Sequence, residues 1–81
     1  MISATLYTKD HCPLCDEVKE ALESLRPTYP HTLTEVDITE NHDTFVYYRY
    51  IIPVVTIGDR TLQAPITLLD LMDALRVANQ S

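Results

Sequence analysis

The two cysteines of this chain, Cys12 and Cys15, stand where two segments of different hydrophobic periodicity meet. Residues 2–7 place apolar side chains at alternate positions with β-branched or aromatic residues between them, which predicts a strand in the middle of a sheet. From Leu14 onward, apolar residues follow the spacing of one helix face, which predicts a helix over residues 13–26. The cysteine pair is therefore predicted to lie at a strand-to-helix corner.

This corner predicts that Cys12 is a nucleophile. At a helix N-cap its sulfur lies beside backbone N–H groups that have no helical partner, and at the positive end of the helix dipole, and both favour thiolate over thiol. An ordinary cysteine, with a pKa of about 8.5, is only a few per cent thiolate at neutral pH, so a modest lowering greatly increases the reactive fraction. Lys9 and a protonated His11 would add nearby positive charge, which neighbouring carboxylates oppose.

Cys15 is predicted to be the resolving thiol. It follows Cys12 by one helical turn on the same face, so a disulfide between them is within reach. Its place on the inner face suits a buried thiol that attacks a mixed disulfide after Cys12 has formed it. Pro13 has a structural explanation, because proline is favoured at the first position of a helix whatever the chemistry. For Cys12, the alternative to a nucleophile is a cysteine that only packs in the fold.

The remaining segments predict one small α/β domain over residues 1–81. The later predicted elements are a strand at 32–38, a helix at 41–50, strands at 54–57 and 61–64, and a helix opening at Thr67. Gly58-Asp59 is a turn of the type that joins antiparallel strands, and Thr67 with Asp70 resembles a capping box. The order β-α-β-α-β-β-α predicts a thioredoxin-like fold, with a mixed four-stranded sheet and helices on both faces.

Two segments resemble glutaredoxins. Residues 6–15, Leu-Tyr-Thr-Lys-Asp-His-Cys-Pro-Leu-Cys, resemble the opening of that family, including a lysine three residues before the first cysteine. Residues 51–55, Ile-Ile-Pro-Val-Val, resemble its second signature, a loop that contains a cis-proline and opens the third strand. With the order of elements, the resemblance covers nearly the whole chain. It is nearest to small glutaredoxin-like proteins with a Tyr-x-x-x-Ile-Pro-Val run, here residues 48–54 with one extra residue.

The resemblance implies a dithiol thiol-disulfide oxidoreductase and a set of substrate contacts. It implies that Pro53 is cis, which would turn the backbone N–H and C=O of Ile52 toward Cys12 to pair with an extended substrate peptide. It also makes Lys9 a possible glutathione contact. The expected site comprises the catalytic Cys12 and Cys15 and the substrate-binding Lys9, His11, Pro13, Leu14, Ile52 and Pro53.

The sequence departs from the glutathione-binding pattern in two places. Glutaredoxins that use glutathione usually carry Gly-Gly followed shortly by Asp after the hairpin, whereas residues 63–67 here read Gln-Ala-Pro-Ile-Thr. Leu14 stands where many of the family have an aromatic residue. The Thr67 hydroxyl remains a possible contact, so both glutathione and a thioredoxin-reductase-like enzyme stay open as the electron donor. No bound cofactor is expected beyond the redox-active disulfide.

Charge and hydropathy limit the classes of partner that we expect this chain to bind. The formal net charge of −6, without clusters of Lys and Arg, argues against nucleic-acid binding. There is no long apolar run and no basic N-terminus ahead of one, so we expect neither a membrane span nor a secretory signal. A cysteine pair of this spacing in a reducing compartment is more often catalytic or metal-binding than structural. We expect a cytoplasmic monomer that acts on disulfide-containing proteins or small molecules.

Two alternatives differ in class. His11 with the two cysteines supplies three of the four ligands of a structural zinc site, and His31 and His42 are predicted instead at a surface turn and a helix start. The other alternative is a thioredoxin-fold binding module without turnover, which keeps its sheet edge or cysteine pair for a protein partner or a metal. The tyrosines of the second helix are predicted to pack, although Tyr7 and Tyr50 are candidates to border the site.

Overall fold

The computed structural model describes residues 1–80 and contains every predicted helix and strand near its predicted position. The elements are β1 (Ile2–Thr8), α1 (Pro13–Leu25), β2 (His31–Asp37), η1 (Ile38–Glu40), α2 (His42–Tyr48), β3 (Val54–Ile57), β4 (Arg60–Gln63) and α3 (Leu68–Asn79). The short 3-10 turn η1 was not predicted. Within residues 1–80, no helix is both long and apolar enough to cross a bilayer.

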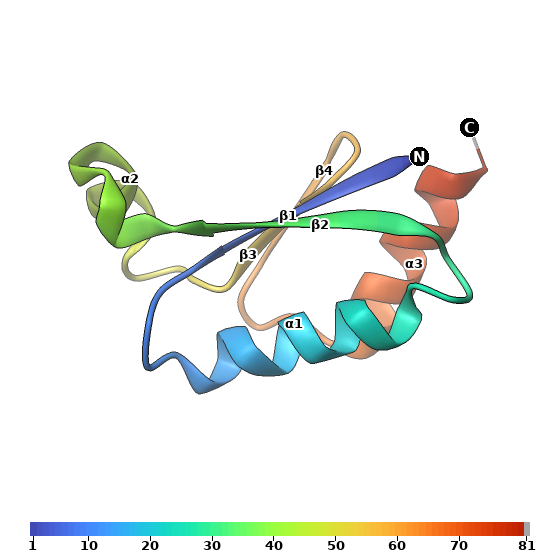
Figure 1. Ribbon diagram of the computed structural model, residues 1–81, viewed down its shortest axis with the longest axis horizontal. Helices are drawn as coiled ribbons and strands as arrows, with labels where there is room; N and C mark the ends of the chain where they lie inside the picture. The colour runs from blue at the N-terminus through green and yellow to red at the C-terminus, as the bar shows by residue number, and fades with distance from the viewer. Residues whose placement is uncertain (81) are drawn as a thin grey trace.

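The strands form one mixed four-stranded sheet, as predicted, and their order in it is β2-β1-β3-β4 (Figure 1). β1 lies inside the sheet, parallel to β2 and antiparallel to β3. β3 and β4 form a hairpin in which Ile57 pairs with Arg60 around the predicted Gly58-Asp59 turn. Gly58 has a φ of 57°, in the left-handed region that residues with a Cβ seldom adopt.

The core lies between the sheet and the two longer helices, α1 and α3, which cover the same face (Figure 1). Side chains of β1 and β3 alternate, so that every second residue faces these helices. The buried residues of the core are Ala4, Leu6, Val18, Leu22, Val55, Ile57, Leu71, Ala74 and Leu75. Leu22 from α1 and Leu75 from α3 have no exposed surface, so both helices are fixed by apolar burial.

The other face of the sheet is covered at one end by α2. Tyr7 of β1 points to this face, and its ring stacks on Tyr48 of α2 with centroids 4.4 Å apart and planes at 18°. Tyr47 meets Tyr48 edge-on at 4.7 Å. Burial raises the pKa of the Tyr48 hydroxyl, and the neighbouring Tyr7 contributes to the shift. Helices therefore lie on both faces, as predicted, and α2 lies at the same end of the molecule as the β1–α1 loop (Figure 1).

The position of His31 in the structure differs from its predicted position. It was expected in a surface turn, but β2 begins at this residue and the side chain is only 2% exposed. Strand alternation places His31 on the same face as Leu33, toward the core, which is why it is buried. Its Nδ1 lies 2.7 Å from the Tyr29 carbonyl oxygen, whereas its buried Nε2 has no partner in the described chain.

Hydrogen bonds and ion pairs fix α3 at its start and against the hairpin. The predicted capping box is present, because the Asp70 N–H donates to the Thr67 hydroxyl at 3.1 Å and the Thr67 N–H donates to the Asp70 carboxylate at 3.0 Å. These two bonds lower the pKa of Asp70. Asp73 accepts from Arg60 of β4 at 2.8 Å and also from Arg76, and hydrogen bonds from these two arginines lower its pKa.

Candidate active site

Cys12 is the N-cap of α1, as the sequence predicted. Its backbone is extended, at φ −117° and ψ 91°, and Pro13 follows at the start of the helix. The Cys15 N–H donates to the Cys12 sulfur at 3.2 Å, so the sulfur performs the capping role that oxygen performs in most helices. A donor N–H at this position also favours negative charge on the sulfur once the thiol is free.

Cys12 and Cys15 form a disulfide, with their Cα atoms 5.2 Å apart. Cys15 is 1% exposed, whereas Cys12 is only partly buried. A substrate that approaches from solvent therefore meets the Cys12 sulfur first. His11, just before the pair, has a φ of 59°, and histidine is among the residue types that adopt this left-handed conformation more often than most. This residue turns the chain from β1 into α1.

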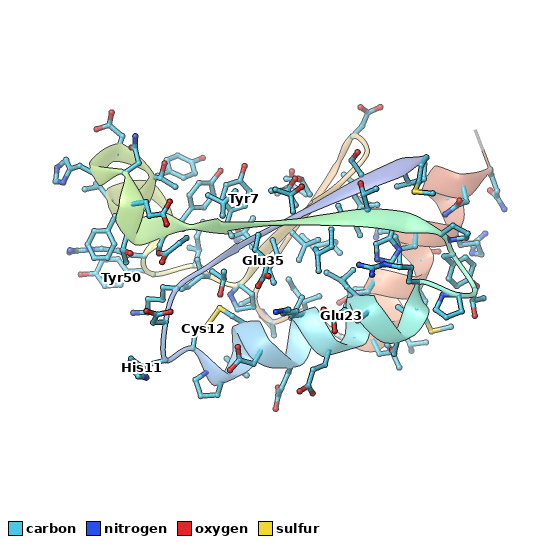
Figure 2. All side chains as sticks on the ribbon, viewed as in Figure 1. Tyr7, His11, Cys12, Glu23, Glu35 and Tyr50 are labelled. Atoms are coloured by element: carbon cyan, nitrogen blue, oxygen red, sulfur yellow. A yellow bond between two sulfur atoms is a disulfide. The ribbon has the colours of Figure 1, made fainter. Side chains whose placement is uncertain are left out.

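A polar groove of about 610 Å³, here called the acidic groove, lies on one side of this corner. Its lining residues are Thr8, Lys9, Asp10, His11, Asp16, Glu35, Val36, Asp37 and Glu40. The expected contacts Lys9 and His11 thus share a groove with five carboxylates. Figure 2 shows the His11 ring on the outer side of the corner and the Cys12 sulfur on the inner side. Negatively charged side chains therefore outnumber the positive charges that were expected around Cys12.

An apolar groove of about 300 Å³ lies beside the helix that carries the cysteines. Its lining residues are Leu14, Glu17, Val18, Ala21, Pro53, Ala64, Pro65, Ile66, Leu68 and Leu71. Two expected contacts, Leu14 and Pro53, are thus brought together although they are far apart in sequence. Leu14 is 59% exposed and Leu68 is 51% exposed, so two leucine side chains at this groove remain largely open to solvent.

Two proline loops form the far wall of the apolar groove. The Ile52–Pro53 bond is cis, as the resemblance to glutaredoxins implied, and the Ala64–Pro65 bond is also cis, which was not predicted. The Ala64 N–H donates to the Pro53 carbonyl at 3.0 Å, which joins the two loops. In this protein, Ala64, Pro65 and Ile66 replace part of the Gly-Gly-Asp pattern of glutathione-using glutaredoxins, and they form part of the apolar wall of this groove.

The backbone of Ile52 differs from the expectation in one respect. Its N–H was predicted to pair with substrate, but it donates to the Tyr48 carbonyl at 3.1 Å. The Ile51 N–H donates to the same carbonyl at 2.9 Å, because the chain after α2 continues as a tight turn up to the proline. Of the two Ile52 peptide groups expected to face a substrate, the N–H is thus already engaged.

The sequence interpretation missed Ile66, Leu68 and the carboxylates of β2 and η1. The signal for Leu68 was present, since Leu68 and Leu69 open α3 with two adjacent leucines and both are exposed. The carboxylates gave no such signal, because only the fold brings Glu35 and Glu40 to the β1–α1 loop. Within residues 1–80, no three His, Cys, Asp or Glu side chains are grouped so as to hold a metal ion.

The order of elements, the mixed sheet and the disulfide at the start of α1 define a thioredoxin-type protein, and this arrangement fits a redox function. The chain belongs to the glutaredoxin-like family, since the model of the glutaredoxin-like domain (DUF836) matches residues 3–77.

Solved structures agree with the thioredoxin-type fold. Structural genomics target protein XcR50 from X. campestris is 29% identical, with a TM-score of 0.78 over 91% of this chain and 96% of that one. Thioredoxin O2 from Arabidopsis thaliana, in its oxidised state, is 16% identical, with a TM-score of 0.75 over 95% of this chain and 74% of its own. Thioredoxin 1 from Thermosipho africanus is 12% identical, with a TM-score of 0.75 over 96% and 94%. At these identities the two thioredoxins show the fold alone.

Proposed function

We propose that this protein is a thiol-disulfide oxidoreductase in which Cys12 attacks a substrate disulfide and Cys15 resolves the product. The observation that carries the proposal is the asymmetry of the pair. Cys12 is the less buried of the two residues, at a helix N-cap where a backbone N–H donates to its sulfur, and Cys15 is buried one turn later and bonded to it. An accessible nucleophile with a buried partner suits sequential exchange.

The proposed reaction starts from the reduced dithiol. The Cys12 thiolate attacks one sulfur of the substrate disulfide, forms a mixed disulfide and displaces the other substrate sulfur as a thiolate, which takes up a proton. Cys15 then loses its proton and attacks the Cys12 sulfur, which displaces the second substrate sulfur as a thiolate that also takes up a proton. The substrate has gained two electrons and two protons, and the protein holds the Cys12–Cys15 disulfide. A thiol donor, either glutathione or a dithiol reductase, restores the reduced form.

Turnover with both donor systems tests the proposal. Reduction of insulin and of a small mixed disulfide is measured with thioredoxin reductase and NADPH, and separately with glutathione, glutathione reductase and NADPH. Turnover in at least one system is expected, and the system that works identifies the donor. If folded protein turns over in neither, the enzyme proposal fails and a binding module without turnover becomes the better interpretation.

A further inference from the structure

We propose that the substrate is a polypeptide whose attacked cysteine is flanked by an apolar side chain, which enters the apolar groove, and by basic residues, which face the acidic groove. This inference rests on the proposed thiol-disulfide exchange and names its substrate class. It starts from the linings of the two grooves, because Leu14, which stands between the two cysteines, lines the apolar groove, and residues 8–11, which directly precede Cys12, line the acidic groove.

The apolar groove adjoins the redox pair. Leu14 lies between the two cysteines in sequence and lines the groove together with Pro53. An extended peptide advances roughly 3.3 Å per residue, so residues one or two positions from the attacked cysteine stay within about 7 Å of it. A side chain at such a position can fill the groove while its cysteine is bonded to Cys12. Leu14 and Leu68, both more than half exposed, would lose contact with water.

The lining of the apolar groove also disfavours a small anionic substrate. Among residues 1–80, Glu17 is the one ionisable residue that lines this groove, and no Lys, Arg or His lines it. Glutathione carries two carboxylates, and neither would meet a cation there. A carboxylate that lost water without a partner would be strongly disfavoured. An aliphatic side chain gains from the same surroundings.

The acidic groove supplies the charge preference. Asp10, Asp16 and three acidic residues from β2 and η1 line it, against Lys9 and His11. Glu35 pairs with Lys19 of α1 at 3.3 Å, and Asp37 accepts hydrogen bonds from the N–H and hydroxyl of Thr39 at 2.9 and 2.6 Å. Asp10, Asp16 and Glu40 are therefore the carboxylates best placed to act on a partner. The whole chain carries 12 acidic and 6 Lys or Arg residues, so its long-range field has the same sign. Basic residues beside the attacked cysteine would be attracted, and like charges repelled.

Peptides with a pyridyl disulfide on their single cysteine provide the test. Attack by Cys12 on the peptide sulfur releases 2-thiopyridone, which is followed by absorbance, and Cys15 then releases the peptide thiol. Three peptides are compared: Leu beside Cys with flanking Lys, Ser beside Cys with flanking Lys, and Leu beside Cys with flanking Glu. Each rate is divided by the rate of the same peptide with 2-mercaptoethanol, which removes differences in intrinsic reactivity. The pyridyl disulfide of glutathione is the fourth substrate.

We expect the Leu peptide to react about tenfold faster than the Ser peptide, in line with the partial burial of a leucine side chain. We expect the Lys peptide to react about fivefold faster than the Glu peptide at low salt, with the difference nearly lost at about 1 M salt. Glutathione is expected to be the slowest substrate. Equal normalised rates for the Leu and Ser peptides, or a Lys preference that salt does not reduce, would overturn the inference.

Matched variants locate the two preferences. Leu68→Ser should reduce the Leu-over-Ser ratio severalfold, whereas Leu69→Ser, its exposed neighbour outside the groove, should leave the ratio unchanged. The double variant D10N/E40Q should reduce the Lys-over-Glu ratio, whereas Glu23→Gln, farther along α1 and away from Cys12 (Figure 2), should not. Equal effects of a groove variant and its control would refute the assignment of that groove.

Reaction with 2,2′-dithiodipyridine separates this inference from the proposed function. Reduced protein that exchanges should release two thiopyridones for each reagent molecule consumed as the Cys12–Cys15 disulfide forms. If that reaction proceeds and the peptides show no discrimination, the substrate class is wrong and the exchange chemistry stands. If the folded, reduced protein reacts with neither the reagent nor the peptides, the proposed function itself is wrong.

Discussion

The Cys12 side chain has two roles that substitutions can separate, helix capping and proposed nucleophilic attack. Both Cys12→Ser and Cys12→Ala remove the nucleophile, so both are expected to abolish disulfide exchange. Only serine keeps an atom that can accept the Cys15 N–H, a bond of 3.2 Å in the structure. Loss of an N-cap acceptor costs about 1 kcal/mol of folding stability, with a range of roughly 0.5–2 kcal/mol. Cys12→Ala should therefore be the less stable variant by about that amount.

The comparison is clean because neither variant can form the disulfide. Urea unfolding under a reducing agent gives the two free energies, and thermal unfolding gives a second measure. For a domain of this size, 1 kcal/mol corresponds to a shift of about 4–8 °C in Tm. Pro13 and the rest of α1 are unchanged in both variants, so the difference reports the cap alone. Equal stabilities would refute a stabilising role for a capping acceptor at position 12, and exchange activity in Cys12→Ala would show that Cys15 is the first nucleophile.

Three further predictions follow from the site and the core. Cys15→Ser should keep the first attack and accumulate a mixed disulfide at Cys12, which mass spectrometry detects; rapid turnover without that adduct would contradict the resolving role. Leu22→Ala should cost about 2–5 kcal/mol in urea unfolding, because the side chain is fully buried, while exchange per folded molecule stays nearly unchanged. The lowered pKa of Asp70 and Asp73 means that the folded state favours their charged forms. Their contribution to stability is complete above the ordinary carboxyl pKa and is lost as the pH falls through the lowered pKa of the folded protein. Asp73→Asn should therefore make the free energy of unfolding fall less steeply below about pH 4. The same pH dependence of that free energy in Asp73→Asn and in the unsubstituted protein would contradict this.

Local sequence patterns determined most of the fold and the chemical centre of the site. Alternating apolar residues before Cys12 and helical spacing after it predicted the strand, the helix and the capping position, and all three are present. The hairpin turn at Gly58 and the capping box at Thr67 were likewise predicted correctly. Each of these features depends on residues within one or two turns of each other. Such short-range preferences can be read along the chain.

Only the tertiary structure decided the surroundings of the site. The apolar groove joins Leu14, Pro53 and Leu68, and the acidic groove joins the β1–α1 loop to β2 and η1, so neither exists before the chain folds. The burial of His31 and the bond from the Ile52 N–H to Tyr48 depended in the same way on where a strand and a turn begin and end. Packing of distant segments selects among local conformations of similar free energy, because burial of apolar surface outweighs small backbone preferences. The sequence therefore located the cysteine pair at the start of α1, and the fold determined which side chains lie beside it.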